Sequence, residues 1–149
     1  MQFAVESYSA CEAEMRLLYP RHWAELATDK TIPLEPNYAK YRELDAAGLV
    51  LLVTARDDGM LVGYYVGFVL PSLHYSTTPS CHTDMFFVMP EWRGEGLPGL
   101  KLFRCVEAEL RRRGIVRWYA QSKLHRDTGI LLRRLGFRAV ETHYEKRLA

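Results

Sequence analysis

A glycine-rich segment in the second half of the chain, Arg93-Gly94-Glu95-Gly96-Leu97-Pro98-Gly99, has the residue types and spacing of an anion-binding loop. It follows a segment with strand character and precedes one with helical periodicity. Glycines leave backbone N–H groups uncovered, and a helix N-terminus carries the positive end of the helix dipole. A plain tight connection would also use glycines. Three glycines directly before a helix favour a phosphate or pyrophosphate site instead.

Two other nucleotide-binding patterns compete for this loop. Residues 94–99 fit G-x-G-x-x-G literally, which is the fingerprint of proteins that bind NAD or FAD. That fingerprint requires an acidic residue about 20 positions later, at the end of the next strand. Here that strand ends Tyr119-Ala120-Gln121-Ser122, and the chain that follows the loop is too short for a doubly wound sheet. The P-loop pattern fails as well, because no Gly-Lys-Ser/Thr follows.

The segments around the loop predict an α+β fold, with a mostly antiparallel sheet flanked by helices. Apolar periodicity, glycines and prolines set the expected bounds. The predicted helices span 9–18 and 22–26, kinked or split at Pro20, then 37–47, a segment from the glycine loop to Gly114, and 125–135. The predicted strands span 3–8, 49–55, 61–70, 82–88, 115–121 and 137–147. Asp57-Asp58-Gly59 is typical of a hairpin turn, so the strands beside it should be antiparallel.

Length and composition narrow the class of protein. A chain of 149 residues, 48% of them hydrophobic, suits one domain with one core. Its 20 basic and 18 acidic residues leave a net charge of +2, which does not favour a nucleic-acid partner. Three widely spaced cysteines predict neither a disulfide framework nor a metal site. The start lacks a leader pattern, and the longest apolar run, 62–70, is too short to span a bilayer. We therefore expect a cytoplasmic protein with no metal and no membrane partner.

Two segments match motifs that one known family combines. The first is Val88-Met89-Pro90-Glu91-Trp92-Arg93-Gly94-Glu95-Gly96, a strand ending in V-x-P followed by R-G-x-G and a helix. The second is Leu131-Leu132-Arg133-Arg134-Leu135-Gly136-Phe137, which resembles L-Y-x-x-x-G-F. With the order of elements over essentially the whole chain, these motifs resemble the GNAT superfamily of N-acetyltransferases. The resemblance implies a single N-acetyltransferase domain over residues 1–149 and a splayed strand pair within a strand-loop-helix-strand crossover.

The chain departs from the family pattern at three positions. Pro98 stands where the family has a small residue, and the loop looks one residue longer. Leu132 replaces the tyrosine that many members use to protonate the departing thiolate, and His125 replaces an asparagine that contacts the cofactor. The long loop and the ending Glu141-x-x-Tyr144-x-Lys146 are similar to acetyltransferases encoded by phages and prophages.

The family resemblance implies that acetyl-CoA is the cosubstrate. The pantetheine arm would pair with the backbone of residues 86–88, and the loop would hold the pyrophosphate. The cofactor-binding residues expected on this basis are Phe86, Phe87, Val88, Arg93, Gly94, Glu95, Gly96, Leu97, Gly99 and His125. One N–H of the strand could polarise the thioester carbonyl.

Direct attack by an amine needs a base, and the candidates are His82 and Asp84. Strand alternation places both on one face with Phe86 and Val88. Alternatively, His82 is simply exposed at a strand start and Asp84 is paired in a salt bridge or caps a loop. Tyr144 is a candidate proton donor to the thiolate, although packing on the sheet is its alternative role.

The function expected from the resemblance is transfer of an acetyl group to a primary amine of a small molecule, protein or peptide. The front helices and the loop 71–80 should form the acceptor pocket, with His22 and Trp23 as candidate lining residues. The alternative is a GNAT-fold module that binds or senses coenzyme A without turnover, because the usual tyrosine is absent. Superfamily members are commonly dimers, so a homodimer is also expected. The sequence does not choose the acceptor.

Overall fold

The computed structural model describes residues 1–149 and contains one five-stranded sheet with the strand order β1-β2-β3-β4-β5. The strands are β1 (Gln2–Glu6), β2 (Val50–Asp57), β3 (Met60–Leu70), β4 (Ser80–Val88) and β5 (Arg117–Tyr119). The helices are α1 (Tyr8–Leu26), α2 (Tyr38–Ala46), α3 (Pro98–Arg112) and α4 (Gly129–Arg134), with a 3₁₀ turn at Pro90–Trp92. Neighbouring strands are antiparallel except β4 and β5, which are parallel. The predicted α+β class is confirmed.

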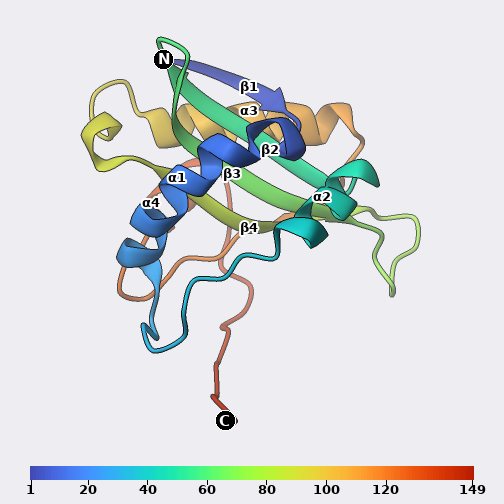
Figure 1. The fold of residues 1–149 in the computed structure, drawn as a ribbon. Coiled ribbons are helices and arrows are strands. Elements are labelled where there is room, and N and C mark those ends of the chain that lie inside the picture. Colours follow the sequence, from blue (N-terminus) through green and yellow to red (C-terminus); the bar gives the residue numbers. More distant parts are fainter.

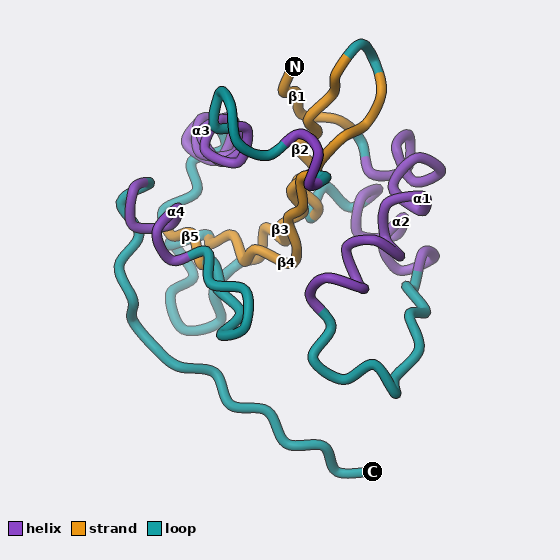
Figure 2. Tube along the Cα trace, turned by 90° about the vertical axis from the view of Figure 1, so that its left-hand side faces the viewer, coloured by secondary structure: helices purple, strands orange, loops and turns teal.

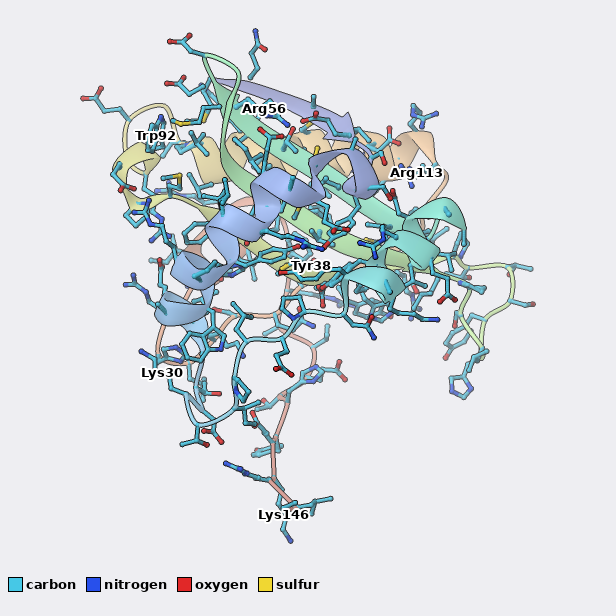
Figure 3. All side chains as sticks on the ribbon, in the orientation of Figure 1. Lys30, Tyr38, Arg56, Trp92, Arg113 and Lys146 are labelled. Atoms are coloured by element: carbon cyan, nitrogen blue, oxygen red, sulfur yellow. The ribbon has the colours of Figure 1, made fainter.

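Helices cover both faces of the sheet, so that the molecule has three layers. Figure 1 shows α1 and α2 in front of the sheet with α3 behind it, and Figure 2 shows the same layers edge-on. The two long helices, α1 and α3, each bury a set of mostly apolar side chains against the sheet. On α3 the apolar stripe consists of Leu102, Phe103, Val106 and Leu110, as predicted. Trp92 and Arg113, which flank the ends of α3, lie on opposite sides of the molecule in Figure 3.

The first helix runs through Pro20 without a break, so the predicted split at this residue is wrong. Proline removes one N–H from the helix ladder and crowds the preceding turn. The flanking residues offset this cost, because Leu18, Tyr19 and His22 are all buried against the sheet. Burial on both sides of Pro20 keeps α1 continuous over 19 residues.

A β-bulge in β4 changes which side chains share a face. Val66 of β3 pairs with Met85 while Gly67 pairs with Thr83, so Asp84 is the extra residue. After the bulge, Phe86 packs with the α3 layer and Phe87 with the α1 layer. The predicted common face of His82, Asp84, Phe86 and Val88 is therefore wrong beyond Asp84. An inserted residue reverses the alternation of all residues that follow it.

The strands β4 and β5 pair only at their first residues, which confirms the predicted splay. The pairs are Ser80 with Arg117, Cys81 with Trp118 and His82 with Tyr119. The Trp118 indole N–H lies 3.0 Å from the Thr83 hydroxyl oxygen and 2.8 Å from the Tyr65 oxygen. These contacts fix the point of divergence, and from Thr83 onward no strand lies beside this edge of β4.

The chain after β5 departs furthest from the sequence expectation. The helix predicted over 125–135 begins only at Gly129, because the Asp127 carboxylate accepts the Gly129 N–H and the Ser122 hydroxyl accepts the Thr128 N–H. Such local bonds compete with helix formation. The predicted last strand, 137–147, is not formed, and the tail runs away from the sheet as an irregular segment (Figure 2). An alternating pattern shows that a segment can pair, but not that a partner edge lies beside it.

Candidate active site

A single large cleft opens where β4 and β5 diverge. Its volume is about 1260 Å³. One wall comes from α1, the α1–α2 loop and α2, and the opposite wall comes from the glycine loop and residues 121–134. Residues 83–88 of β4 form the floor between them. The unpaired edge of β4 therefore faces a space large enough for an extended ligand beside a second molecule.

The glycine loop presents free backbone N–H groups at the N-terminus of α3. The N–H groups of Gly94, Glu95, Gly96, Gly99 and Leu100 donate to no backbone or side-chain acceptor. Gly94 and Gly96 have φ values of 110° and 75°, which favour glycine. Such N–H groups, together with the dipole of a 15-residue helix, suit an anion.

Pro98 begins α3 and Leu97 precedes it in the left-handed conformation. Proline suits the first helical position because its missing N–H would have no partner there. Leu97 has φ 50° and ψ 57°, values that a residue with a side chain adopts at a cost of about 1–2 kcal/mol. Leu97 and Pro98 thus determine how the chain enters the helix, while the N–H groups of Gly99 and Leu100 stay free.

Arg93 ties the end of β4 to the first helix. Its Nε donates to the Val88 carbonyl at 2.7 Å, and its two terminal nitrogens donate to the Glu25 carboxylate at 2.8 Å each. Arg126, from the opposite wall, donates to the same carboxylate at 2.9 Å. Together the two guanidinium groups lower the pKa of Glu25, with Arg93 the larger cause. The Glu25 carboxylate is therefore held in place by two arginines, which also neutralise its charge.

Asp84 projects into the cleft from the bulge of β4 and pairs with a residue on α2. The Tyr41 hydroxyl donates to Asp84 Oδ2 at 2.6 Å. Asp84 is exposed to the cleft, but nearby protein still removes enough hydration to raise the pKa of Asp84, and the hydrogen bond from Tyr41 opposes this rise. No cation pairs with the carboxylate, so it can accept a proton near the unpaired strand edge.

His22 lies in the wall beside Phe87. It is 8% exposed, its ring stacks on Phe87 at 4.9 Å, and its Nδ1 lies 2.7 Å from the Tyr64 hydroxyl oxygen. Burial lowers the pKa of His22 to about 4, so the ring is neutral at pH 7. The residue thus extends the uncharged part of the front wall.

The structure brings most of the predicted cofactor residues into the cleft lining. Those that line it are Phe86, Phe87, Val88, Arg93, Gly94, Leu97, Gly99 and His125. Glu95 and Gly96 belong to the same loop but not to the lining, so only their N–H groups bear on the site. His125 lies in the connection before α4 rather than on a helix.

Of the predicted catalytic residues, only Asp84 lines the cleft. His82 lies where β4 and β5 still pair, and its ring stacks on Tyr119 at 4.7 Å. Tyr144 is 93% exposed on the irregular tail. The absence of the last strand therefore removes the reason to place Tyr144 near the leaving group.

The sequence missed Tyr41, Glu25 and Glu35, all of which line the cleft. Tyr41 contacts a residue 43 positions away, and Glu25 contacts one 68 positions away. Neither spacing produces a local pattern. His22 and Trp23, named as candidate lining residues, do line the cleft.

These features define an α+β fold in which a cleft between diverging strands ends at a helix N-terminus with free N–H groups. A model described as the acetyltransferase (GNAT) family matches residues 12–137. The chain therefore belongs to the GNAT family of acetyltransferases, a family that uses acetyl-CoA. No curated protein matches the chain.

Several solved structures have the same fold. A ribosomal-protein-alanine N-acetyltransferase from Brucella melitensis biovar Abortus 2308 is 18% identical with a TM-score of 0.72, covering 99% of this chain and 100% of that chain. An aminoglycoside acetyltransferase from an uncultured soil metagenomic sample, in complex with sisomicin, is 15% identical with a TM-score of 0.75, and the match covers 99% of this chain and 96% of that chain. An aminoglycoside N-acetyltransferase in complex with CoA is 17% identical with a TM-score of 0.70, and the match covers 98% of this chain and 99% of that chain. At these identities the likeness extends to the fold.

Proposed function

We propose that this protein transfers the acetyl group of acetyl-CoA directly to a primary amine bound in the same cleft. The observation that carries the proposal is the group of free N–H donors in the glycine loop, of which Gly94, Gly99 and Leu100 line the cleft beside the unpaired edge of β4. A linked pair of phosphates at the loop would lead an extended arm along that edge. The cleft volume of about 1260 Å³ leaves space for an acceptor beyond it.

The cofactor half of the cleft also has the charge that phosphates require. Three cationic side chains of the lining, Lys123, Arg126 and Arg134, come from the segment 121–134, and the same segment contributes His125 as a hydrogen-bonding group. With the N–H groups of the loop they would hold the phosphates of coenzyme A. Arg93 would stabilise the wall through Glu25 and Val88 rather than bind a phosphate itself, because its nitrogens already have partners.

Asp84 is the proposed general base. An ammonium cannot attack a carbonyl carbon, and Asp84 would take its proton directly or through one water molecule. Acetyl-CoA supplies the acetyl thioester: the amine nitrogen bonds to the carbonyl carbon, the carbon–sulfur bond breaks, and the reaction releases the amide, the free thiol and one proton. An N–H of the β4 edge would stabilise the negative charge on the carbonyl oxygen.

The leaving thiolate would be protonated by water. Leu132, at the position where many family members have tyrosine, is 8% exposed and packs in the core beneath α3, so it offers no acid. Thiols are much stronger acids than alcohols, so coenzyme A can leave as a thiolate without a strong acid beside it. Loss of the tyrosine is therefore compatible with turnover.

We further propose that residues 1–149 act as one N-acetyltransferase domain. The protein would be cytoplasmic and would form a homodimer. Light scattering after size-exclusion chromatography tests the dimer. None of the helices is both long and apolar enough to cross a membrane.

The test of the proposed function combines calorimetry and turnover. Wild-type protein should bind coenzyme A in a titration and release free thiol from acetyl-CoA when amines are added. Gly99→Asp would place a carboxylate among the free N–H groups, where a helix N-terminus tolerates it but a pyrophosphate does not. We expect at least about tenfold weaker binding of coenzyme A, equivalent to 1.4 kcal/mol.

The matched control is Ser76→Asp, in the exposed loop between β3 and β4; this loop was expected to help form the acceptor pocket, but none of its residues lines the cleft. This substitution adds the same charge away from the cleft and should leave binding unchanged. Binding without thiol release for any amine would favour the non-catalytic coenzyme A module. Absence of binding by wild-type protein would refute both functions.

A further inference from the structure

The cleft is divided by charge along its length. Every lysine and arginine in its lining belongs to residues 93–134, on the cofactor side. The wall formed by α1, the α1–α2 loop and α2 contributes no basic side chain except His22, whose pKa of about 4 leaves it neutral. The two halves would therefore attract ligands of opposite charge.

Two carboxylates without a cationic partner face the acceptor half. Asp84 accepts a hydrogen bond only from Tyr41. Glu35, in the α1–α2 loop, lines the cleft, is exposed, and forms no ion pair or hydrogen bond. The other two acidic residues of the lining are already engaged, since Glu25 pairs with two arginines and Asp127 accepts from Ser122 and Gly129. Glu35 is thus the one carboxylate in this half that has neither a protein partner nor a proposed catalytic role.

The same wall also offers aromatic and apolar surface to the cleft. Tyr19, Trp23 and Tyr41 line it, together with Leu34 and Pro36. Aromatic faces attract cations and cover hydrocarbon chains. An anionic acceptor would find no basic group here to neutralise its charge.

From this arrangement, and building on the proposed function, we infer that the acceptor is a small amine that carries a second cationic group. The reacting amine lies next to Asp84, the second ammonium pairs with Glu35, and the carbon skeleton between them packs on the aromatic wall. Linear polyamines and amino sugars with several amino groups share this chemistry. Monoamines lack the second cationic group, and ω-amino acids and phosphorylated amino sugars carry an anionic group in its place.

The test compares acceptors of equal length that differ in one end group. Initial rates are measured with acetyl-CoA and an α,ω-diaminoalkane, the monoamine with the same carbon chain, and the ω-amino acid of that length. We expect kcat/KM to be highest for the diamine and at least about tenfold lower for the amino acid. Added salt should weaken the diamine preference, because the second contact is an exposed ion pair. An aminoglycoside and a linear polyamine, assayed in parallel, distinguish the two sources of such an amine.

Glu35→Gln isolates the second contact. It should lower kcat/KM for the diamine about tenfold and leave the monoamine unaffected. Glu145→Gln, on the exposed tail, makes the same charge change outside the cleft and should alter neither value. Equal or better turnover of the amino acid would overturn the inference, as would an equal effect of Glu35→Gln on all three acceptors.

Binding provides a readout that does not depend on turnover. Calorimetry of each acceptor, with coenzyme A present, should show the same order of affinity and the same loss in Glu35→Gln. If wild-type protein binds coenzyme A but prefers the monoamine or the ω-amino acid to the diamine, the inference fails while the proposed function stands. If coenzyme A does not bind, the proposed function fails, and diamine binding by wild-type and Glu35→Gln protein still tests the acidic wall.

Discussion

The hydroxyl of Tyr41 on α2 donates a hydrogen bond to Oδ2 of Asp84 on β4 at 2.6 Å, across the acceptor end of the cleft. Tyr41 also stacks on Tyr8 of α1, with ring centroids 4.7 Å apart. Packing therefore fixes the donor, and the donor in turn holds the carboxylate. The α1–α2 layer thus orients the proposed base as well as forming the acceptor wall.

Asp84→Asn should lower kcat/KM by about 10²-fold to 10⁴-fold, because the amide cannot take a proton from the acceptor. Burial raises the pKa of Asp84, so at pH 7 the native state carries a partly dehydrated charge that the unfolded chain does not. Replacing Asp84 by asparagine removes the free-energy cost of this partly dehydrated charge. Urea unfolding at pH 7 should therefore show no loss of stability, which separates loss of the base from misfolding. Retained activity in this variant would rule out Asp84 as the base.

Tyr41→Phe should move the acidic limb of the pH profile of kcat/KM to higher pH. The Tyr41 hydroxyl bonds to the ionised carboxylate and so lowers the pKa of Asp84 against the effect of burial. Without this donor the pKa rises further, and less of the base is ionised at a given pH. Activity above the limb should recover, which a merely structural role would not produce. A profile that falls at all pH values without shifting would contradict the positioning role.

His22 should make stability depend on pH below 6.5. Burial lowers the pKa of His22 from 6.5 to about 4, so between these values the unfolded state binds more protons than the native state. Stability is fully present above pH 6.5 and falls as the pH approaches 4, by about 3 kcal/mol from this residue. His22→Gln retains a polar contact for Tyr64 but does not titrate. Urea unfolding of both proteins between pH 4 and 7 should show a flatter dependence in the variant, and equal slopes would be the contrary result.

The link between Arg93 and Glu25 should be measurable as a coupling free energy. The contact has two hydrogen bonds at 2.8 Å, but the Arg93 side chain is 37% exposed, so we expect about 1 kcal/mol or less. Because the pKa of Glu25 is lowered, this contribution is present above pH 4.5 and is lost as the pH falls through the folded-state value. A double-mutant cycle of Arg93→Met and Glu25→Gln at pH 7 and pH 3 measures it. Additive effects at pH 7 would show that the two residues are not coupled.

Local patterns in the sequence predicted the parts of the fold that local rules determine. The apolar stripe of α3, the hairpin at 57–59 and the glycine loop each depend on residues a few positions apart. The continuity of α1 through Pro20 depends instead on burial of its neighbours in a sheet formed later in the chain. Propensity gave the wrong answer there because tertiary packing outweighs it.

The glycine-loop end of the candidate site was predictable from the sequence, and the wall formed by α1, the α1–α2 loop and α2 was not. Free N–H groups follow from glycines and a helix start, which the sequence displays. The contacts of Tyr41 with Asp84 and of Arg93 with Glu25 join residues on different elements. The bulge at Asp84 is a feature of the pairing between β4 and β3, and no residue type in β4 predicts it. The faces of Phe86 and Val88 could therefore not be derived from alternation alone.

Gly63 controls how closely β3 approaches the floor of the cleft. A Cβ added there would lie 2.7 Å from the Phe87 carbonyl oxygen and 3.0 Å from a Val88 methyl carbon. Since the first of these is backbone, β4 itself must shift, and Gly63→Ala should destabilise the protein by about 1–3 kcal/mol.

Gly99→Ala is the matched comparison for stability. A Cβ there meets only Leu131 Cδ2 at 3.6 Å, and alanine favours a helix over glycine, so stability should stay equal or rise slightly. Urea unfolding measures both variants. Gly63→Ala should also weaken coenzyme A binding in calorimetry, even when the variant is fully folded. The reason is that the added methyl group would displace the edge of β4 at residues 86–88. Normal affinity and stability in Gly63→Ala would show that β4 yields freely, and its unpaired edge could then not serve as a rigid template for the acyl donor.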